Sequence, residues 1–272
     1  GATCAEALRA EGATGTILLI GEEPGLPYQR PPLSKTFITS AQESTARPVV
    51  SEARFQALDI DVALGRPVAS VAARKRLVRL PADAGQPADQ IHFGHLLIAT
   101  GASPVRLSVP GADLGGIHYL RSIADARALR ASALKTQHAV VIGASFIGVE
   151  IAASLCQRGV KVTIVEERAH VLGKMKTPAL SAYFKSVLES HGVEVILRDA
   201  PASFAGSAQV EAVFTREGRT LPCDMVVVGI GVTPDTGLLH GSGIHVNPGV
   251  LVARFLQTNH HSIFAAGDVA NF

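Results

Sequence analysis

The sequence predicts an α/β protein built from two interleaved, doubly wound parallel sheets. Two observations lead to this prediction: a strand–turn–helix–strand unit occurs twice along the 272 residues, and several short apolar runs are continuous. Runs such as Leu96–Ile98, Ala139–Ile142 and Met225–Val228 are typical of strands buried on both faces of a parallel sheet. The length suits two medium-sized domains, each with a core of its own.

The second copy of the repeated unit is complete. Ala139–Ile142 is predicted as a buried strand, Gly143–Gly148 as a tight turn, Val149–Gly159 as a helix and Lys161–Val165 as the next strand, which ends on Glu166. Glycines at such a turn let the pyrophosphate of a dinucleotide approach the free N–H groups at the helix N-terminus. This copy therefore predicts a Rossmann-like dinucleotide site.

The residues of the turn have separate expected roles. Gly143 makes the turn, and Gly148 lets the helix pack closely on the strand. Ser145 stands where the usual fingerprint has its middle glycine, which leaves slightly less room beside the phosphates. The nucleotide-contacting residues predicted for this turn are Gly143, Ser145, Ile147 and Gly148.

A carboxylate at the end of the second strand is expected to bind the adenosine ribose hydroxyls. Glu166 has this position in the second copy and would repel a 2′-phosphate, so the sequence favours NADH over NADPH. Arg168, two residues further on, could partly offset that repulsion.

The first copy begins part-way through the motif. Gly1 aligns with Gly148, because the next glycine follows at the same spacing in both copies. Thr16–Ile20 is then the second strand, and Glu22 is the counterpart of Glu166. The first strand and the first two glycines of the motif are missing before Gly1, so we expect a fragment of a longer protein that would not hold its dinucleotide tightly by itself.

Composition excludes several classes of function. The net charge is +2 with both signs interspersed, which argues against a nucleic-acid or membrane surface as the main partner. The longest apolar stretch, residues 139–155, contains two glycines and Glu150, so no membrane span is expected, and neither is a signal peptide. The three cysteines include no Cys-x-x-Cys and the ten histidines are scattered, so we expect a cytoplasmic protein without a disulfide framework or a metal site.

A proline-rich segment, Pro27–Lys35, follows the first acidic strand end. Two adjacent prolines hold its backbone extended, and Ser34 could cap the short helix that Lys35 enters. The run RPPLSK resembles the flavin-binding segment of NADH-dependent ferredoxin reductases and the apoptosis-inducing factor family, within the pyridine nucleotide-disulfide oxidoreductase superfamily. The resemblance implies that Arg30 and Lys35 approach the pyrophosphate and the isoalloxazine of FAD. The alternative is a surface turn with two basic residues.

The resemblance extends along the whole chain. Residues 96–101 look like the strand and turn that return the chain beside FAD, residues 228–234 like the crossing from the NAD domain back to the FAD domain, and residues 263–270 like the closing FAD motif. In the family, the matching aspartate of the closing motif accepts hydrogen bonds from the ribityl chain. Together with the residues above, the cofactor-contacting residues expected are Gly1, Glu22, Arg30, Lys35, Val68, Ala99, Thr100, Gly101, Arg121, Glu166, Gly231, Gly267 and Asp268.

Glu150 has two interpretations. It lies in the first turn of the predicted helix, where the helix dipole alone favours an acid. In the resembled family, the glutamate of this Gly-x-Glu meets the lysine of the proline segment near the flavin. The resemblance therefore implies a Lys35–Glu150 pair that steadies positive charge beside flavin N5. We favour this interpretation, with Lys35 and Glu150 as the catalytic residues, brought together by the two domains.

The expected division places the FAD-binding domain in residues 1–114 and 233–272 and the NAD-binding domain in residues 115–232. In the resembled family, a further domain that covers the flavin follows the position of Phe272, so the two-domain fold is expected to be truncated at both ends.

The resemblance implies a flavoprotein reductase. NADH would give hydride to FAD, and the flavin would pass electrons to a small iron–sulfur protein, a ferredoxin or a Rieske protein. No cysteine lies between Gly21 and Ser51, where disulfide reductases of the superfamily place their redox sulfur, so dithiol chemistry is not expected. Two alternatives stay open: an NADH-sensing flavoprotein that acts through a long-lived charge-transfer complex and dimerisation, and a quinone or ascorbate-radical reductase. The intact protein could also form a homodimer.

Overall fold

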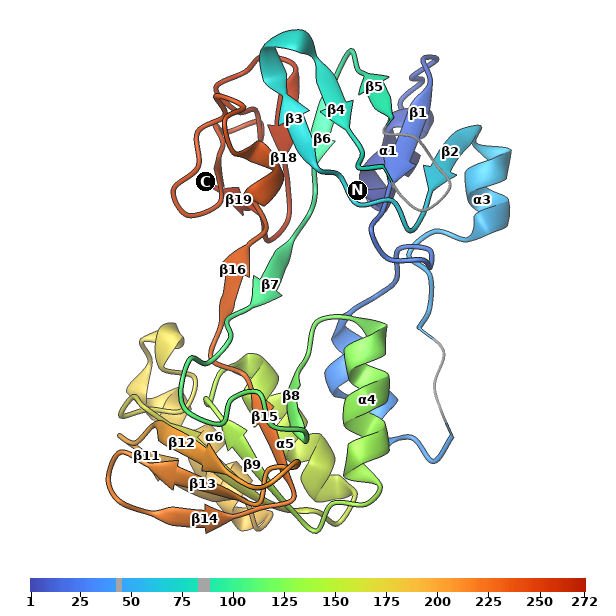
Figure 1. Ribbon diagram of the computed structural model, residues 1–272. Helices are drawn as coiled ribbons and strands as arrows, with labels where there is room; N and C mark the ends of the chain where they lie inside the picture. Colours follow the sequence, from blue (N-terminus) through green and yellow to red (C-terminus); the bar gives the residue numbers. More distant parts are fainter. Residues whose placement is uncertain (43–45, 83–88) are drawn as a thin grey trace. The chain divides into compact units, whose positions relative to one another are not determined.

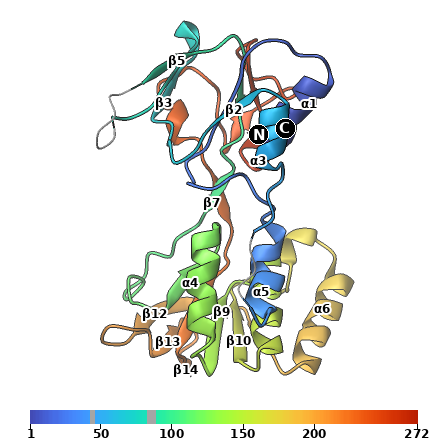
Figure 2. The same ribbon diagram turned by 90° about the vertical axis from the view of Figure 1, so that its right-hand side faces the viewer.

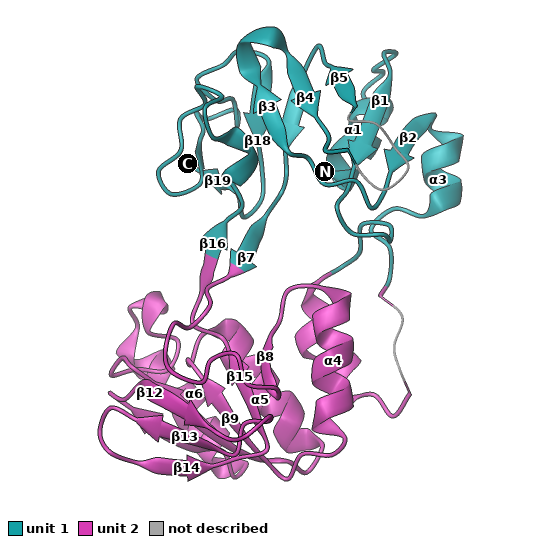
Figure 3. Cartoon of the chain, viewed as in Figure 1, with its two compact units in different colours: residues 1–29, 47–103, 233–272 teal, residues 30–46, 104–232 magenta. Residues whose placement is uncertain are grey.

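The computed structural model describes residues 1–42, 46–82 and 89–272, which form two compact units (Figures 1 and 3). Unit 1 consists of residues 1–29, 47–103 and 233–272, and unit 2 of residues 30–46 and 104–232. The chain thus passes repeatedly from one unit to the other, as expected of interleaved domains. Residues 30–46 and 104–114 belong to unit 2, whereas the sequence-based division places them with residues 1–114.

Unit 2 contains a five-stranded parallel sheet with the strand order β11-β10-β9-β15-β8. The strand order reverses between the neighbouring strands β9 and β15. Doubly wound folds bind their ligands at such a switch point. The strands are β8 (Ile117–Tyr119), β9 (His138–Ile142), β10 (Lys161–Glu166), β11 (Glu194–Leu197) and β15 (Met225–Val228). The structure confirms a doubly wound α/β fold here.

The two faces of this sheet are covered differently. Figures 1 and 2 show α5 (Phe146–Gln157) and α6 (Pro178–Ser190) on one face and the antiparallel strands β12 (Pro201–Ala205), β13 (Ala212–Thr215) and β14 (Thr220–Pro222) on the other. Since successive side chains of a strand point to opposite faces, alternate residues of β9 and β15 pack on β12 and β13. This cluster contains Val140, Ile142, Val165, Phe204, Val210, Val213, Cys223, Val226 and Val228.

Residues 30–41 pack on the helices of unit 2. This segment forms η1 (Pro31–Ser34) and α2 (Thr36–Thr39), which contact α4 (Ile123–Ala133) and α5. The last carbonyls of a short helix have no partners within it. Here the buried Arg130 donates hydrogen bonds to the carbonyls of Phe37, Ile38, Ser40 and Ala41 at 2.7 to 3.3 Å, and Arg158 donates to that of Ile38 at 3.2 Å. These contacts explain why the segment belongs to unit 2.

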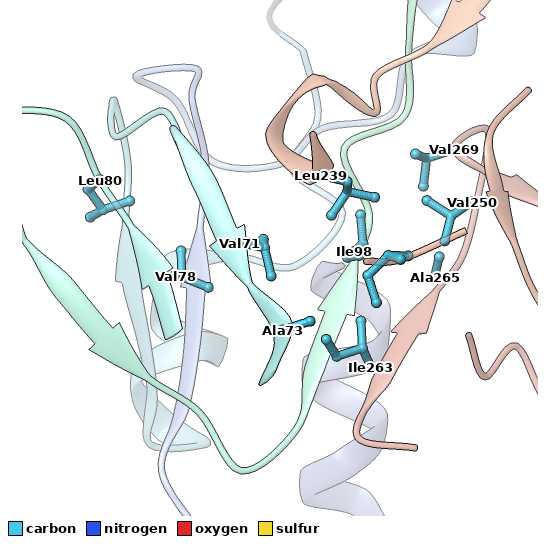
Figure 4. Close-up of a cluster of buried hydrophobic side chains, with 11 residues drawn as sticks. Val71, Ala73, Val78, Leu80, Ile98, Leu239, Val250, Ile263, Ala265 and Val269 are labelled. Carbon is cyan, nitrogen blue, oxygen red and sulfur yellow. The ribbon is translucent and has the colours of Figure 1, made fainter. Parts of the chain in front are cut away.

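Unit 1 combines parallel strand pairs with an antiparallel three-stranded sheet. Strand β1 (Ile17–Ile20) pairs with β2 (Ile60–Ala63), and β6 (Leu96–Ile98) with β18 (Ile263–Ala265), both in parallel. Its main core lies between β6, β18 and the antiparallel sheet (Figure 4). The cluster contains Val71, Ala73, Val78, Leu80, Ile98, Leu239, Ile244, Val250, Ile263, Ala265 and Val269.

The remaining elements are short. They are α1 (Ala2–Ala10), α3 (Glu52–Ala57), β3 (Ser70–Ala72), η2 (Ala73–Lys75), β4 (Leu77–Arg79), β5 (Gln90–His92), β7 (Ala102–Pro104), η3 (Gly173–Met175), β16 (Val232–Pro234), η4 (Gly237–Leu239), β17 (Val250–Leu251) and β19 (Ala270–Asn271). Among the described helices, none combines the length and the apolar character that a membrane crossing requires.

Most predicted elements occur where the sequence places them. The second strand of the first copy, predicted at Thr16–Ile20, is β1, which begins at Ile17. The predicted helix Val149–Gly159 is α5, which begins earlier, at Phe146, because Ser145 is its N-cap. A serine in extended conformation at this position accepts a hydrogen bond from a free N–H of the first turn, so the helix can start directly after it.

A buried carboxylate anchors the loop between β11 and β12. Asp199 accepts hydrogen bonds from the backbone N–H groups of Ala200 at 2.8 Å and Glu217 at 3.2 Å, and from Nη1 of Arg219 at 2.6 Å. Burial alone would raise the pKa of Asp199, but the hydrogen bonds from Thr215, Glu217, Arg219 and Ala200 outweigh it and lower the pKa below its usual 3.8.

We therefore expect Asp199→Asn to lower the free energy of unfolding by about 2 kcal/mol at pH 7, because a charge-assisted network is lost. A carboxylate with a lowered pKa in the folded state stabilises the protein above its unfolded pKa and loses this effect as the pH falls through the folded value. Denaturant titrations should thus show the two proteins converging below pH 3.8. Glu167→Gln, which removes the exposed partner of Arg216, is the control and should change stability by about 0.5 kcal/mol or less. A difference that persists at low pH would contradict the assignment.

Candidate functional site

Three glycines of unit 2 meet where β9, α5 and β15 come together. A Cβ atom on Gly148 would lie 2.0 Å from the carbonyl oxygen of Gly143, and one on Gly143 would lie 2.6 Å from that of Gly229. Gly143 also has a φ of +95°, which L side chains rarely adopt. Side chains are therefore excluded at Gly143 and Gly148, so the start of α5 packs closely on the ends of β9 and β15.

Gly229 was not among the sequence-based candidates. It directly follows β15, and a Cβ atom there would lie 3.1 Å from the backbone nitrogen of Gly148. The signal was present in the sequence as a glycine after a buried strand. Its importance depends on the pairing of β15 with β9, which the sequence alone does not show.

Ser145 connects the glycine turn to the end of β15. Its Oγ donates a hydrogen bond to the carbonyl oxygen of Gly229 at 2.6 Å and accepts a weaker one from the N–H of Gly148 at 3.4 Å. The serine in the middle glycine position thus caps α5 and fixes the turn. Ile147 lies half-buried in the first turn of the helix.

Glu166 lies at the end of β10 beside this turn. Its two carboxylate oxygens accept hydrogen bonds from the backbone N–H groups of Ala144 at 2.6 Å and Arg168 at 2.8 Å. The carboxylate is therefore fixed at the strand end that dinucleotide folds use to bind ribose. Arg168 contacts it through the backbone.

A pocket of about 300 Å³ opens at the carboxyl ends of β9, β10 and β15. Its lining includes the glycine turn, the carboxylate of Glu166 and three basic residues, Arg168, Lys174 and Arg216. The glycine turn, the N-terminus of the 12-residue helix α5 and nearby cations suit a pyrophosphate, and the carboxylate suits sugar hydroxyls. These residues fit the adenosine diphosphate half of a pyridine nucleotide. Gly231, with a φ of +135°, lies between Ile230 of the pocket lining and the start of β16.

Lys35 and Glu150 form an ion pair, with 2.7 Å between Nζ and Oε1. The prediction that two domains bring them together is wrong, because both residues belong to unit 2. The segment with Lys35 is held on α4 and α5 by the arginine contacts described above. Their side chains are 49% and 32% exposed, so the charges remain accessible.

Ser34 does not cap the short helix, contrary to the prediction. It ends η1, and α2 begins after Lys35 without a side-chain cap. The Ser34 hydroxyl instead donates to Oε2 of Glu150 at 2.5 Å. The two prolines do not hold the backbone extended, as predicted, but start a 3-10 turn, because the fixed φ of proline also suits that turn. The turn packs on α5, where the Ser34 hydroxyl donates to the Glu150 carboxylate instead of accepting from an N–H group of the following helix.

Arg30 and Arg121 also meet within unit 2, since Nη1 of Arg30 donates to the carbonyl oxygen of Arg121 at 2.5 Å. Arg121 precedes α4, whose N-terminus carries a capping box formed by Ser122 and Asp125. The cap fixes the backbone on which Arg121 lies.

The remaining candidate residues belong to unit 1. Ala99, Thr100 and Gly101 follow β6, Glu22 follows β1, and Gly267 and Asp268 follow β18, so these six residues lie at the carboxyl ends of parallel strands, where doubly wound folds bind ligands. A Cβ atom on Gly1 would lie 3.3 Å from Leu19 and 3.7 Å from Ala99. Val68 packs on the core cluster.

The ends of these strands leave room for a ligand. Gly267 has a φ of +82°, and a Cβ atom there would meet no described atom within 4 Å. Glu22 and Asp268 are exposed. The Thr100 hydroxyl is used within the unit, where it donates to the carbonyl oxygen of Asp235 at 2.7 Å. The open strand ends and the carboxylates fit a ligand rich in hydroxyl groups, as the ribose and ribityl parts of FAD are.

The three cysteines are free thiols. Cys223 is buried in the core of unit 2, and burial raises the pKa of its thiol to about 12, which makes it unreactive. Cys4 and Cys156 are partly buried on α1 and α5. In residues 1–42, 46–82 and 89–272, no three His, Cys, Asp or Glu side chains gather as a metal site would require.

The doubly wound fold and the glycine turn define a dinucleotide-binding architecture. The family model described as pyridine nucleotide-disulphide oxidoreductase matches residues 1–272, so the chain belongs to this family.

Curated relatives support the same family. The chain is 37% identical over 273 residues to rhodocoxin reductase of Rhodococcus erythropolis, covering 100% of this chain and 63% of the relative. It is 37% identical to the ferredoxin–NAD(+) reductase component of the biphenyl dioxygenase system of Paraburkholderia xenovorans, covering 99% of this chain and 65% of the relative. The chain thus spans less than two thirds of the length of these two proteins.

Solved structures agree on the fold. The ferredoxin reductase for the CYP199A2 system of Rhodopseudomonas palustris matches with a TM-score of 0.91 and 36% identity, over 98% of this chain and 65% of that one. The reductase chain in the covalent putidaredoxin reductase–putidaredoxin complex matches with a TM-score of 0.90 and 29% identity, over 98% of this chain and 65% of that one.

Gly148→Ala should disrupt the turn, because its Cβ would lie 2.0 Å from a backbone oxygen that cannot move without displacing β9. We expect the free energy of unfolding to fall by about 2 kcal/mol or more, measured by denaturant titration. Gly237→Ala is the control: its Cβ would meet no atom of the described residues within 4 Å, so stability should change by about 0.5 kcal/mol or less. Equal stability of the two variants would show that the turn relaxes and that the steric argument is wrong.

Proposed function

We propose that the intact protein is an NADH-dependent flavoprotein reductase that passes electrons through FAD to a small iron–sulfur protein of the ferredoxin or Rieske type. The pocket of unit 2 carries the proposal, since its glycine turn and strand-end carboxylate suit a pyridine nucleotide. The names of the relatives, which are reductases of rhodocoxin and ferredoxin, support the type of acceptor.

Unit 2 would bind NADH. The N–H groups at the start of α5 would hold the pyrophosphate, with Gly143, Ser145, Ile147 and Gly148 around it. Glu166 would accept hydrogen bonds from the ribose hydroxyls, because each of its oxygens keeps acceptor capacity beyond the one N–H that it binds. Gly231 would lie beside the bound nucleotide.

Unit 1 would hold FAD at the carboxyl ends of β1, β6 and β18. Glu22 would bind the adenosine ribose, Val68 the adenine through its backbone, and Asp268 the ribityl hydroxyls. A bound FAD would supply the two-electron acceptance and one-electron release that this reaction needs. The backbone around Gly1 and the turn Ala99–Gly101 would lie against the bound FAD and keep water from its surface.

Lys35 and Glu150 would act on the reacting centre. The resemblance places Lys35 beside the flavin, together with Arg30 and Arg121, and the pair already forms within unit 2. An ammonium at this position favours an anionic form of its neighbour, while the carboxylate fixes the ammonium in place. We further propose a cytoplasmic protein that can form homodimers; the free thiols are compatible with a reducing compartment.

The intact protein should use NADH at least about tenfold better than NADPH in kcat/KM, a difference of about 1.4 kcal/mol, because Glu166 repels a 2′-phosphate. Glu166→Gln should narrow this preference, since the repulsion is lost. Glu189→Gln on α6, which removes a carboxylate outside the pocket lining, should leave it unchanged. Steady-state kinetics with both nucleotides decide the point. Equal use by the wild type would assign control of the ribose pocket to Arg168.

The reduced protein should transfer electrons rapidly to a ferredoxin or Rieske protein, measured by stopped-flow reoxidation after one equivalent of NADH. A variant with serine at positions 4, 156 and 223 should behave like the wild type, because no step uses a thiol. Persistence of the reduced protein in air for minutes would instead support an NADH sensor. Preferential oxidation by a quinone or by ascorbate radical would change the acceptor class. Loss of activity in the serine variant without loss of flavin would overturn the thiol-free mechanism.

A further inference from the structure

The carboxylate of Glu150 is shared between two donors from the same segment. Lys35 Nζ lies 2.7 Å from Oε1, and the Ser34 hydroxyl lies 2.5 Å from Oε2. A hydroxyl has one hydrogen to donate, and the competing acceptor, the carbonyl oxygen of Pro31, is 3.4 Å away. The Ser34 hydrogen therefore goes to Glu150, at the short distance typical of a charge-assisted hydrogen bond.

The ion pair alone is a weak way to fix these side chains. Lys35 and Glu150 are both flexible, and their side chains are 49% and 32% exposed, so solvent screens their attraction. Exposed pairs of this kind contribute little, because the Coulomb gain is offset by lost side-chain freedom. Another contact must hold Glu150 in one orientation if the pair is to keep a fixed geometry.

Ser34 has the rigidity that the ion pair lacks. It is 5% exposed and follows two prolines, whose rings fix φ. Its carbonyl oxygen accepts a hydrogen bond at 2.7 Å from the hydroxyl of the buried Ser154, which lies one helical turn after Glu150 on α5. Two hydrogen bonds thus hold Ser34 against α5, and one of them is to the glutamate.

We propose that Ser34 is a positioning residue for the proposed hydride transfer. By binding Oε2 of Glu150, Ser34 turns the other carboxylate oxygen towards Lys35 and so fixes the ammonium. The inference rests on the proposed function for its catalytic consequence. Its geometric part, the orientation of Glu150 by Ser34, holds for the protein without any reaction.

The geometric part is tested by acetylation of lysines in the intact protein as purified, followed by mass spectrometry. Ser34→Ala should speed the acetylation of Lys35 by about threefold, because Glu150, the partner of Lys35, loses the hydrogen bond that fixes its carboxylate. Glu150→Gln should have a similar effect, because it removes the negative charge that pairs with Lys35. Lys185, which pairs with Glu189 on α6, is the internal reference and should not change. Unchanged acetylation of Lys35 in Ser34→Ala would overturn the proposal.

Ser154→Ala is the matched control. It removes the other hydrogen bond that holds Ser34 on α5 but leaves the bond from Ser34 to Glu150 intact. If Ser34 acts only by stabilising the fold, Ser34→Ala and Ser154→Ala should speed Lys35 acetylation equally. The proposal predicts an effect for Ser34→Ala alone, and equal effects would overturn it.

The catalytic part is tested by stopped-flow measurement of hydride transfer from NADH. Ser34→Ala should slow hydride transfer by about fivefold at saturating NADH, with little change in the concentration of NADH for half-maximal rate. In a Glu150→Gln background, the same substitution should have no further effect, because Ser34 acts through Glu150. Additive slowing, or wild-type rates in Ser34→Ala with faster acetylation, would overturn the catalytic role.

The two parts fail separately. If the wild type holds no flavin or does not oxidise NADH, the proposed function is wrong, while the acetylation series still decides whether Ser34 orients Glu150. If the wild type is an active reductase and Ser34→Ala matches Ser154→Ala in every measurement, the proposed function stands and the positioning role of Ser34 is rejected.

Discussion

The close backbone packing of Gly143, Gly148 and Gly229 is the constraint on which the rest of unit 2 depends. Because Gly148 has no Cβ atom, α5 can start directly against the end of β9, and the direction of the helix is then fixed. Glu150, Ser154 and Arg158 follow at intervals of four residues and share one face of the helix. All three contact the segment that contains Ser34 and Lys35. The same turn therefore forms the nucleotide pocket and sets the position of the ion pair.

Backbone carbonyl groups decide to which unit residues 30–41 belong. A four-residue helix satisfies few of its own carbonyls, and here Arg130 and Arg158 satisfy those at its C-terminal end. Arg130 is buried, and its hydrogen bonds within the described part of the chain are to carbonyl oxygens of this segment, so burying its charge depends on the segment staying in place. This coupling explains a domain boundary that chain order alone would place elsewhere.

The sequence predicts the local elements well and the long-range contacts poorly. Met225–Val228 is a strand because buried parallel strands have continuous apolar runs, and the spacing of glycines predicts the turn before α5. The lysine–glutamate pair could be predicted only through the family resemblance, and its placement in one unit could not. Neither could the role of Ser34, because local rules favour a serine as a helix cap and only the packing of η1 on α5 offers it a carboxylate.

The number of donors around each carboxylate separates structural acids from acids that can bind a ligand. An ionised carboxylate has about four acceptor sites. Asp199 is buried and uses its sites on Thr215, Ala200, Glu217 and Arg219, so it serves the fold. Glu166 receives two backbone N–H groups and remains half-buried at the pocket, and Glu150 receives one hydroxyl and one ammonium with a third of its side chain exposed. Both keep sites free among the described residues, and a ligand with hydroxyl or ammonium donors can use them without breaking the contacts that hold the side chains in place.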